Sequence, residues 1–165
     1  MLAIKKVGTE SIPAIQELAE KTWAIAYASI LPQEQLRYML ELFYSNNALE
    51  EQIAKGHQFI LITDNEEPLG FAAYSLKSED DLTLYRLHKL YVDPASQGSG
   101  AGKRLVDFIV ADIKPKGAKI LQLNVNRSNK AIGFYQKLGF IIRYEEDIDI
   151  GNGYFMNDYV MELPL

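Results

Sequence analysis

The chain contains no cysteine and only two histidines, His57 and His88, among its 165 residues. Without cysteine it forms no disulfide, and it has no thiolate that could bind a metal or act as a nucleophile. Two histidines are also too few for a histidine-rich zinc site. We therefore expect a protein with neither disulfides nor a bound metal.

Long hydrophobic runs and an excess of positive charge are also missing. No apolar segment approaches the roughly 18 residues of a membrane span, and residues 1–15 lack the apolar core of a signal peptide. The 17 Lys and Arg against 22 Asp and Glu leave a net charge of −5, which disfavours nucleic acid as a partner. We expect a soluble, cytoplasmic protein that binds neither membranes nor nucleic acids. The acidity mildly favours a cationic substrate, although it serves solubility equally well.

What is present suits one globular domain. Apolar residues make up 48% of the chain, which is enough for one substantial core, so we expect a single domain over residues 1–165. The N-terminal part predicts a strand at 2–7 and then a helix from Ser11, its N-cap, to about residue 28. A second helix should begin near Pro32, and a third short helix should run from a cap at Asn47 to Gly56.

From residue 57 onward the hydrophobic period changes from that of a helix to that of strands. The Gly-Asn-Gly sequence near the C-terminus strongly predicts a hairpin turn. The order of elements favours an α+β fold with a mixed, mostly antiparallel sheet over a doubly wound parallel one. The expected elements are strands at 57–64, 69–76, 82–92 and 120–126, helices at 103–113 and 129–138, and a last hairpin of 140–150 with 154–163.

Three glycines, Gly98, Gly100 and Gly102, alternate between an expected strand and an expected helix. The first N–H groups of a helix have no internal partner, and the helix dipole adds positive potential there. Glycine lets an anion reach these donors, and Lys103 or Arg104 could add a charge. The loop therefore suits a pyrophosphate, although a tight turn that binds nothing is the alternative. Its spacing differs from those of the P-loop and the Rossmann fingerprint.

The segment QGSGAG at 97–102 resembles the acetyl-CoA loop of the GNAT superfamily of N-acetyltransferases. LHKLYVDP at 87–94 resembles the fourth strand of that family, and NKAIGFYQKLGF at 129–140 resembles its second signature. The resemblance covers roughly residues 80–165 well and the N-terminal half only in outline. It implies a GNAT-like, mixed and mostly antiparallel sheet of about seven strands flanked by helices on both faces, with acetyl-CoA as co-substrate.

The same resemblance implies which residues hold the cofactor. The amide of Leu90 would donate to the thioester carbonyl, as in an oxyanion hole. Asn129 lies one residue nearer to Tyr135 than in many members, so Ser128 or Asn126 could take its place. The predicted cofactor-binding residues are Leu90, Tyr91, Val92, Gln97, Gly98, Ser99, Gly100, Ala101, Gly102, Lys103, Asn129, Tyr135 and Lys137.

Acetyl transfer to an amine requires two proton transfers. An alkyl amine with a pKa near ~10.4 is almost wholly protonated at pH 7, so a base must take its proton. The departing thiolate leaves more readily when an acid protonates it. The resemblance implies that Tyr135 is this acid, with its hydroxyl near the sulfur. The alternative is that Tyr135 is only an amphipathic core aromatic.

His88 is the predicted base. Side chains alternate along a strand, so His88 shares a face with Leu90, where many members of the family carry a carboxylate. An unperturbed pKa near ~6.5 suits a base at neutral pH, and a histidine bonded to a backbone carbonyl is the alternative. The acidic segment 145–149 could instead supply the base, although a solvated strand explains it too.

The resemblance implies that the N-terminal helices wall the acceptor pocket. Trp23 and Tyr27 lie one helical turn apart and are the predicted substrate-binding residues, with plain helix packing as the alternative. The C-terminal hairpin resembles members related to polyamine acetyltransferases. A polyamine needs spaced carboxylates, which Asp147, Asp149 and Asp158 could supply.

The leading prediction is an acetyl-CoA-dependent N-acetyltransferase that moves an acetyl group to a primary amine of a small molecule, with a polyamine as one candidate. Direct attack in a ternary complex is the expected route. An acetyltransferase acting on a protein N-terminus or lysine, and a non-catalytic CoA-binding sensor domain, are the alternatives. The acceptor partner would be a small-molecule or peptide amine, and a homodimer is compatible with the family.

Overall fold

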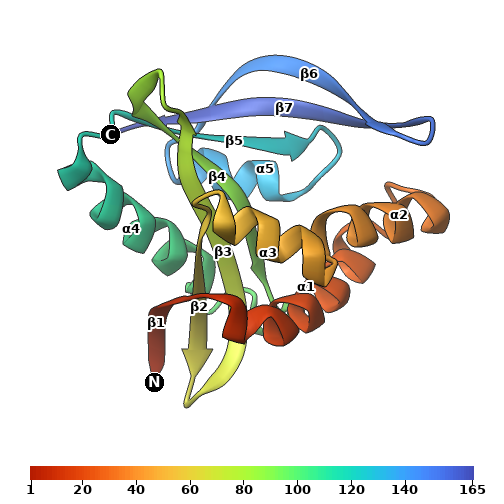
Figure 1. Ribbon diagram of the computed structural model, residues 1–165, viewed down its shortest axis with the longest axis horizontal. Coiled ribbons are helices and arrows are strands. Elements are labelled where there is room, and N and C mark those ends of the chain that lie inside the picture. The colour runs from red at the N-terminus through yellow and green to blue at the C-terminus, as the bar shows by residue number, and fades with distance from the viewer. The chain divides into compact units, whose positions relative to one another are not determined.

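The structure, a computed structural model, describes residues 1–165 and contains seven strands and five α-helices (Figure 1). The strands form one hydrogen-bonded sheet in the order β1-β2-β3-β4-β5-β7-β6. The elements are β1 (Leu2–Val7), α1 (Ile12–Ala26), α2 (Gln33–Tyr44), α3 (Asn46–Ala54), β2 (Gln58–Asp64), β3 (Glu67–Ser78), β4 (Asp81–Val92), α4 (Ala101–Ile113), β5 (Ile120–Asn126), α5 (Ala131–Lys137), β6 (Ile141–Gly151) and β7 (Tyr154–Pro164). Short 3-10 turns, η1 (Thr9–Ser11), η2 (Pro94–Ser96) and η3 (Lys114–Lys116), lie between them.

The chain forms two compact units. The first unit comprises Met1–Ser75 and Lys89–Ile109, and the second comprises Leu76–His88 and Val110–Leu165. The first unit therefore holds the N-terminal helices and the glycine loop, and the second holds α5 and the C-terminal hairpin. None of the helices is both long enough and apolar enough to cross a membrane.

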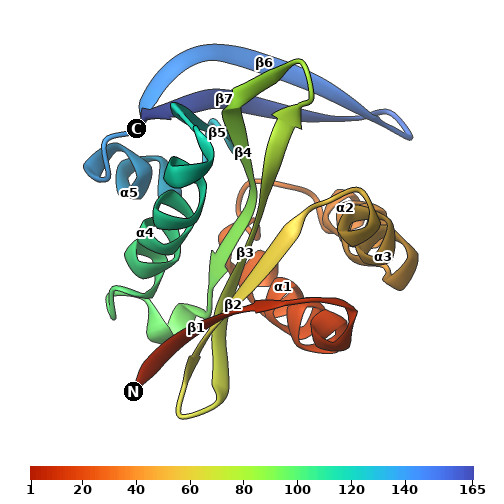
Figure 2. The ribbon, with the colours of Figure 1, turned by 60° about the vertical axis from the view of Figure 1, so that its left-hand side comes forward.

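In the first unit, β2 and β3 form an antiparallel hairpin that is buried on both faces. Phe59 pairs with Ala73 and Leu61 pairs with Phe71, and all four are buried. Figure 2 shows α1, α2 and α3 on one side of these strands and α4 on the other. Because helices cover both faces, the run 59–62 is continuously apolar rather than alternating.

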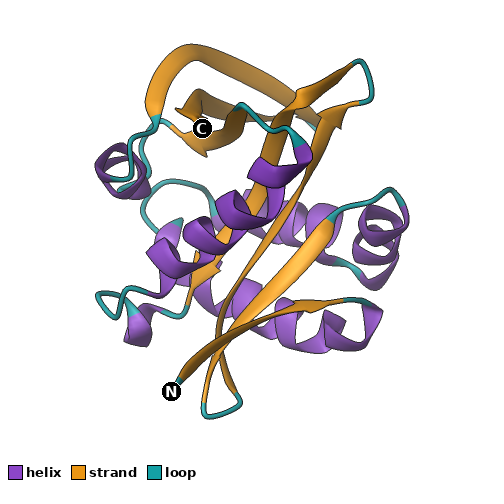
Figure 3. Cartoon of the chain, turned by 90° about the vertical axis from the view of Figure 1, so that its left-hand side faces the viewer, coloured by secondary structure: helices purple, strands orange, loops and turns teal.

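In the second unit, β5 pairs in parallel with β4 and antiparallel with β7, which in turn pairs antiparallel with β6. Leu121 and Leu123 are buried on one face of β5, whereas the alternate residues Gln122 and Asn124 form a polar face. Short loops join the elements, and the hairpin between β6 and β7 turns at Asn152 (φ +56°), as the Gly-Asn-Gly sequence predicts (Figure 3).

The predicted fold class is confirmed: the sheet has seven strands and is mixed and mostly antiparallel. Two details of helix capping differ from the prediction. Ser11 stands at the N-cap of α1 but makes no side-chain cap bond. The cap of α3 is Ser45, whose hydroxyl accepts a hydrogen bond from the Ala48 amide at 3.2 Å, rather than Asn47.

Candidate active site

The glycine loop connects η2 to α4 in the first unit. Gly98 and Gly100 have left-handed backbone conformations (φ +87° and +84°), and a Cβ built on either would meet no atom within 4 Å. No backbone hydrogen bond is donated by the amides of Gly98, Gly100 or residues 101–103. The last three belong to the first helical turn, which has no internal acceptors. The loop is therefore an open run of main-chain donors at the positive end of a helix dipole, which suits an anion.

Asp93 holds the turn that precedes this loop. Its carboxylate accepts a hydrogen bond from the Ala95 amide at 3.0 Å and one from Lys21 Nζ at 3.1 Å. The Asp93 amide donates to the Leu69 carbonyl at 2.6 Å. The bond from Ala95, with a smaller contribution from Lys21, lowers the pKa of Asp93, so the carboxylate stays ionised. The end of β4 is therefore tied to both β3 and α1.

Strands β3 and β4 approach each other closely at Gly70. A Cβ built on Gly70 would lie 2.7 Å from the Tyr91 carbonyl oxygen and 3.2 Å from Val92 Cα. Only glycine lets the strands come this close. Gly70 therefore positions the backbone of 90–92, which the family resemblance assigns to the cofactor. We did not single out Gly70 in the sequence, where a glycine inside an expected strand was the available signal.

Two loop side chains predicted to contact the cofactor have protein partners. Lys103 Nζ forms an ion pair with Asp107 at 2.6 Å across one turn of α4. The Ser99 hydroxyl donates to the Ser96 carbonyl at 2.5 Å. The Lys103 pair is exposed and is worth little in water, so an anion can compete for the lysine at small cost.

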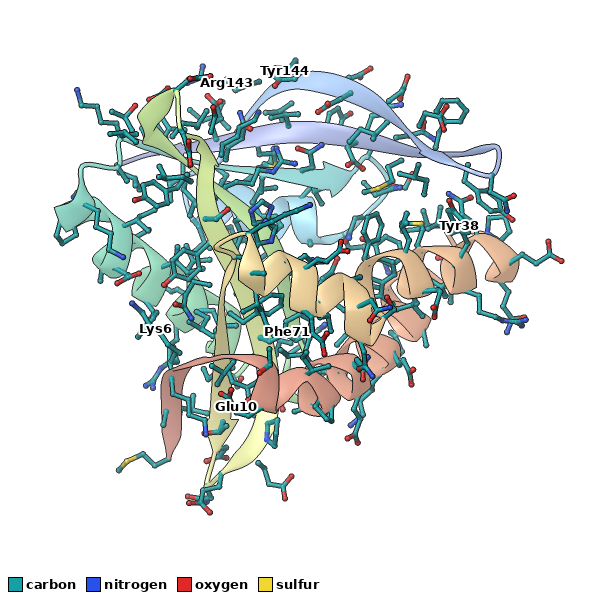
Figure 4. The ribbon with its side chains drawn as sticks, viewed as in Figure 1. Lys6, Glu10, Tyr38, Phe71, Arg143 and Tyr144 are labelled. Atoms are coloured by element: carbon teal, nitrogen blue, oxygen red, sulfur yellow. The ribbon has the colours of Figure 1, made fainter.

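The predicted acceptor residues lie in a buried aromatic cluster of the first unit. The rings of Trp23 and Tyr27 are 5.0 Å apart, as expected for residues that share a helix face. Trp23 also contacts Tyr44 at 5.5 Å and Tyr91 at 5.8 Å, and Phe71, visible in Figure 4, contacts both Tyr44 and Tyr91. Trp23 is only 4% exposed and Tyr27 8%, so both contribute to packing. Their role in acceptor binding stays a prediction.

In the second unit, Tyr135 is buried on α5. Its ring contacts those of Phe134 at 5.2 Å and Phe140 at 5.4 Å. The helix ends two residues later, at Lys137, and the Tyr135 carbonyl accepts the amides of Leu138 and Phe140 beyond the helix end. This packing holds the phenol ring in one orientation, as an acid catalyst requires.

The residues before α5 are occupied in local turns. Asn129 Oδ1 accepts the Ala131 amide at 2.8 Å, and Asn126 Oδ1 accepts the Ser128 amide at 2.9 Å. Asn129 therefore keeps its Nδ2 group and one lone pair of Oδ1 for any contact with a cofactor. Lys137 is exposed in the last turn of α5, where a cation complements the helix dipole.

Gln122 connects three charged side chains on the polar face of the second unit. Its Oε1 accepts hydrogen bonds from Lys77 at 2.7 Å and from Arg86 at 3.1 Å, and its Nε2 donates to Glu162 at 2.8 Å. Gln122 is only 3% exposed, so these bonds satisfy a buried amide.

Asn124 connects the next group of charges on the same face. Its Oδ1 accepts from Arg86, and its Nδ2 lies 3.2 Å from Glu146 and 3.3 Å from Asp158. Burial raises the pKa of Asp158, against the lowering effects of Asn124 and Arg86. Our sequence reasoning had not identified Arg86, Gln122 or Asn124, although the alternation of polar and apolar residues along β5 was a signal for them.

The three aspartates predicted to space a polyamine do not share one face of the sheet. Asp158 pairs across the strands with Glu146, whereas Asp147 pairs with Asn157. Directly opposed residues in an antiparallel pair lie on one face, and their neighbours lie on the other. Asp147 instead binds Arg127 at 2.6 Å. The structure thus corrects the expectation by joining Asp158 with Glu146 and separating it from Asp147 and Asp149.

His88 lies half-buried on β4 in the second unit. Tyr85 and Leu87 are buried, and they pair across the strands with Leu121 and Leu123 on the apolar face of β5. Strand alternation therefore places His88 on the same face as Arg86. This face carries the polar side chains of β5 and β7, so His88 lies in surroundings compatible with proton transfer.

The residues of the first unit fit the diphosphate of a coenzyme A ligand. The space beside Gly98 and Gly100 is open, because a Cβ on either would meet no atom within 4 Å. The neighbouring backbone amides of 101–103 donate no hydrogen bond to another backbone group. The profile of the acetyltransferase (GNAT) domain matches residues 27–163, and the chain therefore belongs to this family.

Individual relatives carry different activities. A peptidyl-lysine N-acetyltransferase of Salmonella typhimurium is 34% identical over 92 residues, which are 55% of this chain and 54% of that protein. The chain thus spans about half the length of this relative. The spermidine N(1)-acetyltransferase of Thermoplasma acidophilum is 25% identical over 167 residues, covering 98% of this chain and 96% of that protein.

Solved structures confirm the GNAT fold. The N-acetyltransferase PaiA of Thermoplasma acidophilum, crystallised with coenzyme A, superposes with a TM-score of 0.84 and 24% identity. The superposition covers 100% of this chain and 99% of that one. The fold and the family predicted from the two sequence motifs are both confirmed.

Proposed function

We propose that the chain is an acetyl-CoA-dependent N-acetyltransferase that transfers an acetyl group to a primary amine of a small molecule by direct attack in a ternary complex. The glycine loop carries this proposal, because its unpartnered amides at a helix start suit a diphosphate. Acetyl-CoA supplies the activated acetyl thioester. Membership of the acetyltransferase family supports the same activity.

In the first unit, the loop 97–103 and the backbone of 90–92 would bind the co-substrate. In the second unit, the residues proposed to bind the cofactor are Asn129, Tyr135 and Lys137. The unpartnered main-chain donors bind the diphosphate, and the Leu90 amide donates to the carbonyl oxygen that gains charge during transfer.

Tyr135 would provide the proton for the leaving thiol, and His88 would take the proton of the attacking amine. His88 lies on a polar strand face, which favours this role over simple core packing. The His88→Ala variant should lose the acidic limb of the pH–rate profile near pH 6–7. A profile that keeps this limb would transfer the role to the acidic strand or to a water chain.

The acceptor is proposed to be a small cationic amine such as a polyamine. The near full-length similarity to a spermidine N(1)-acetyltransferase supports this class, as does the net charge of −5. The Asp158–Glu146 pair gives an acidic position on a strand face of the second unit. The relative that acetylates peptidyl-lysine favours a second candidate, a lysine on a protein.

Thiol release from acetyl-CoA, measured against a panel of amines, tests the proposal. We expect turnover with spermidine or a related polyamine to exceed turnover with amino acids, aminoglycosides and lysine peptides. Preference for a lysine peptide would favour the second candidate. No release with any amine, together with no binding of acetyl-CoA by calorimetry, would refute the proposal.

A further inference from the structure

Lys89, at the end of β4 in the first unit, has no acidic partner. Its Nζ lies 5.2 Å from the centre of the Tyr44 ring and 5.9 Å from the centre of the Phe59 ring. It forms no ion pair and no hydrogen bond. Most lysines keep the ammonium group in water, whereas this one lies against aromatic faces.

The titratable groups around this ammonium supply no negative charge. Burial raises the pKa of Tyr44 on α2 well above its ordinary value, so the hydroxyl stays neutral. Burial, followed by the charges of Lys89 and Lys55, lowers the pKa of His57, which precedes β2. Desolvation without a counter-ion therefore lowers the pKa of Lys89 to about 8.

This environment makes Lys89 a reactive amine. At pH 7 a lysine with that pKa is about 10% neutral, whereas an ordinary lysine is less than about 0.1% neutral. Only the neutral amine is a nucleophile. The residue is half-buried, so part of its side chain is open to solvent.

We propose that Lys89 is a self-acetylation site, whose Nζ accepts the acetyl group of acetyl-CoA. This inference rests on the proposed function for its acetyl donor. The neutral Nζ attacks the thioester carbonyl carbon, a C–N bond forms and the C–S bond breaks. The proton lost by nitrogen ends on the thiolate, giving free coenzyme A and an acetylated lysine. The product is uncharged, so it removes a cation from the aromatic surroundings of Tyr44 and Phe59.

Site-resolved acetylation tests this inference. The full chain is incubated with acetyl-CoA in the absence of an amine acceptor, and the acetyl occupancy of each lysine is followed by peptide mass spectrometry. Lys89 should react about 10-fold faster or more than the exposed Lys103 and Lys137, with a rate that rises to a midpoint near pH 8. Trace labelling with acetic anhydride measures the same lysines without acetyl-CoA and should give the same order.

The Lys89→Arg variant, which keeps the positive charge, is the matched control and should lose the fast acetylation. Acetylation of Lys89 no faster than that of Lys103 would overturn the inference. If an added polyamine is acetylated in the same sample while Lys89 stays unmodified, the inference is overturned but the proposed function stands. Absence of both reactions, with Lys89 still labelled by acetic anhydride, would reject the acetyl-CoA-dependent function together with the inference.

Discussion

Tyr135 is the residue whose proposed role is easiest to separate from its packing. Its ring contacts Phe134 and Phe140, and these contacts do not require the hydroxyl. Tyr135→Phe keeps these ring contacts and should leave the affinity for acetyl-CoA near normal. The turnover number should fall about 10²-fold because the leaving thiolate loses its acid. Steady-state kinetics and calorimetry measure both quantities, and an unchanged kcat would exclude Tyr135 as the acid.

Lys89 should make the stability of the chain depend on pH. Its pKa is about 8 in the folded chain against 10.5 for an unperturbed lysine, so the unfolded chain binds more protons between these values. The free energy of unfolding should therefore rise as the pH increases from about 8 to about 10. Lys89→Met removes the half-buried charge and should raise this free energy by about 1–3 kcal/mol at pH 7, and by less at pH 10.

Urea unfolding of both chains at the two pH values checks this expectation. A difference that stays constant with pH would show that the lysine titrates normally. The Lys103→Met variant serves as control, because the Lys103 ammonium is exposed and pairs with Asp107, so its removal should change the free energy of unfolding little.

Among the elements, the contact between β3 and β4 depends on a single glycine. The methyl group in Gly70→Ala would overlap the Tyr91 carbonyl, so β4 must shift. We expect a loss of about 1–3 kcal/mol in stability and weaker binding of acetyl-CoA, because the backbone at 90–92 moves. Thermal unfolding and calorimetry measure the two effects.

Gly133→Ala is the matched control for this substitution. Gly133 lies within α5, and a Cβ there would meet no atom within 4 Å. Alanine should stabilise the helix by about 0.5–1 kcal/mol. Equal behaviour of the two variants would show that the close approach at Gly70 has no consequence.

The strands and helices themselves follow closely from local patterns. Residues 120–126 were predicted as a strand and form β5 with the same bounds. The prediction of Asn47 as the N-cap of α3 was wrong, because Ser45, Asn46 and Asn47 are all residue types that suit an N-cap. The connection from α2 gives Ser45 the extended backbone that a cap requires (φ −63°, ψ 158°). Local propensity cannot rank neighbours whose conformations are set by the packing of two helices.

For the molecule as a whole, the net charge of −5 should affect acceptor capture. A cationic polyamine is attracted over distances up to about a Debye length, which shrinks from about 10 Å at 0.1 M salt to about 3 Å at 1 M. We therefore expect kcat/KM for a polyamine to fall with added salt, and more steeply than for a monoamine. Identical slopes in a salt titration would exclude steering by the charge of the chain.

The fold and the family could be predicted because their signals are local in the sequence. Two signals carried the prediction: the alternating glycines before a helix and the NKAIGFYQKLGF segment. Each is a short contiguous stretch, so it can be recognised without knowledge of the tertiary structure. The roles of Trp23 and Asn129 could not be read in the same way. Trp23 proved to be enclosed by Tyr44 and Tyr91, and the side chain of Asn129 accepts the Ala131 amide in a local turn before α5.

The amino-acid sequence alone determined the order of the strands and helices, the glycine loop and membership of the acetyltransferase family, because periodicity and backbone conformation depend on neighbouring residues. Only the tertiary structure decided the surroundings of Lys89 and the joining of Asp158 with Glu146 and Asn124. The grouping of Asp158 with Glu146 depends on how β6 pairs with β7, and the surroundings of Lys89 depend on which aromatic rings pack against its ammonium. The residues that set charge and burial at these positions lie 22 to 45 positions away in the chain. Sequence patterns that span a few residues carry no information about such distant contacts.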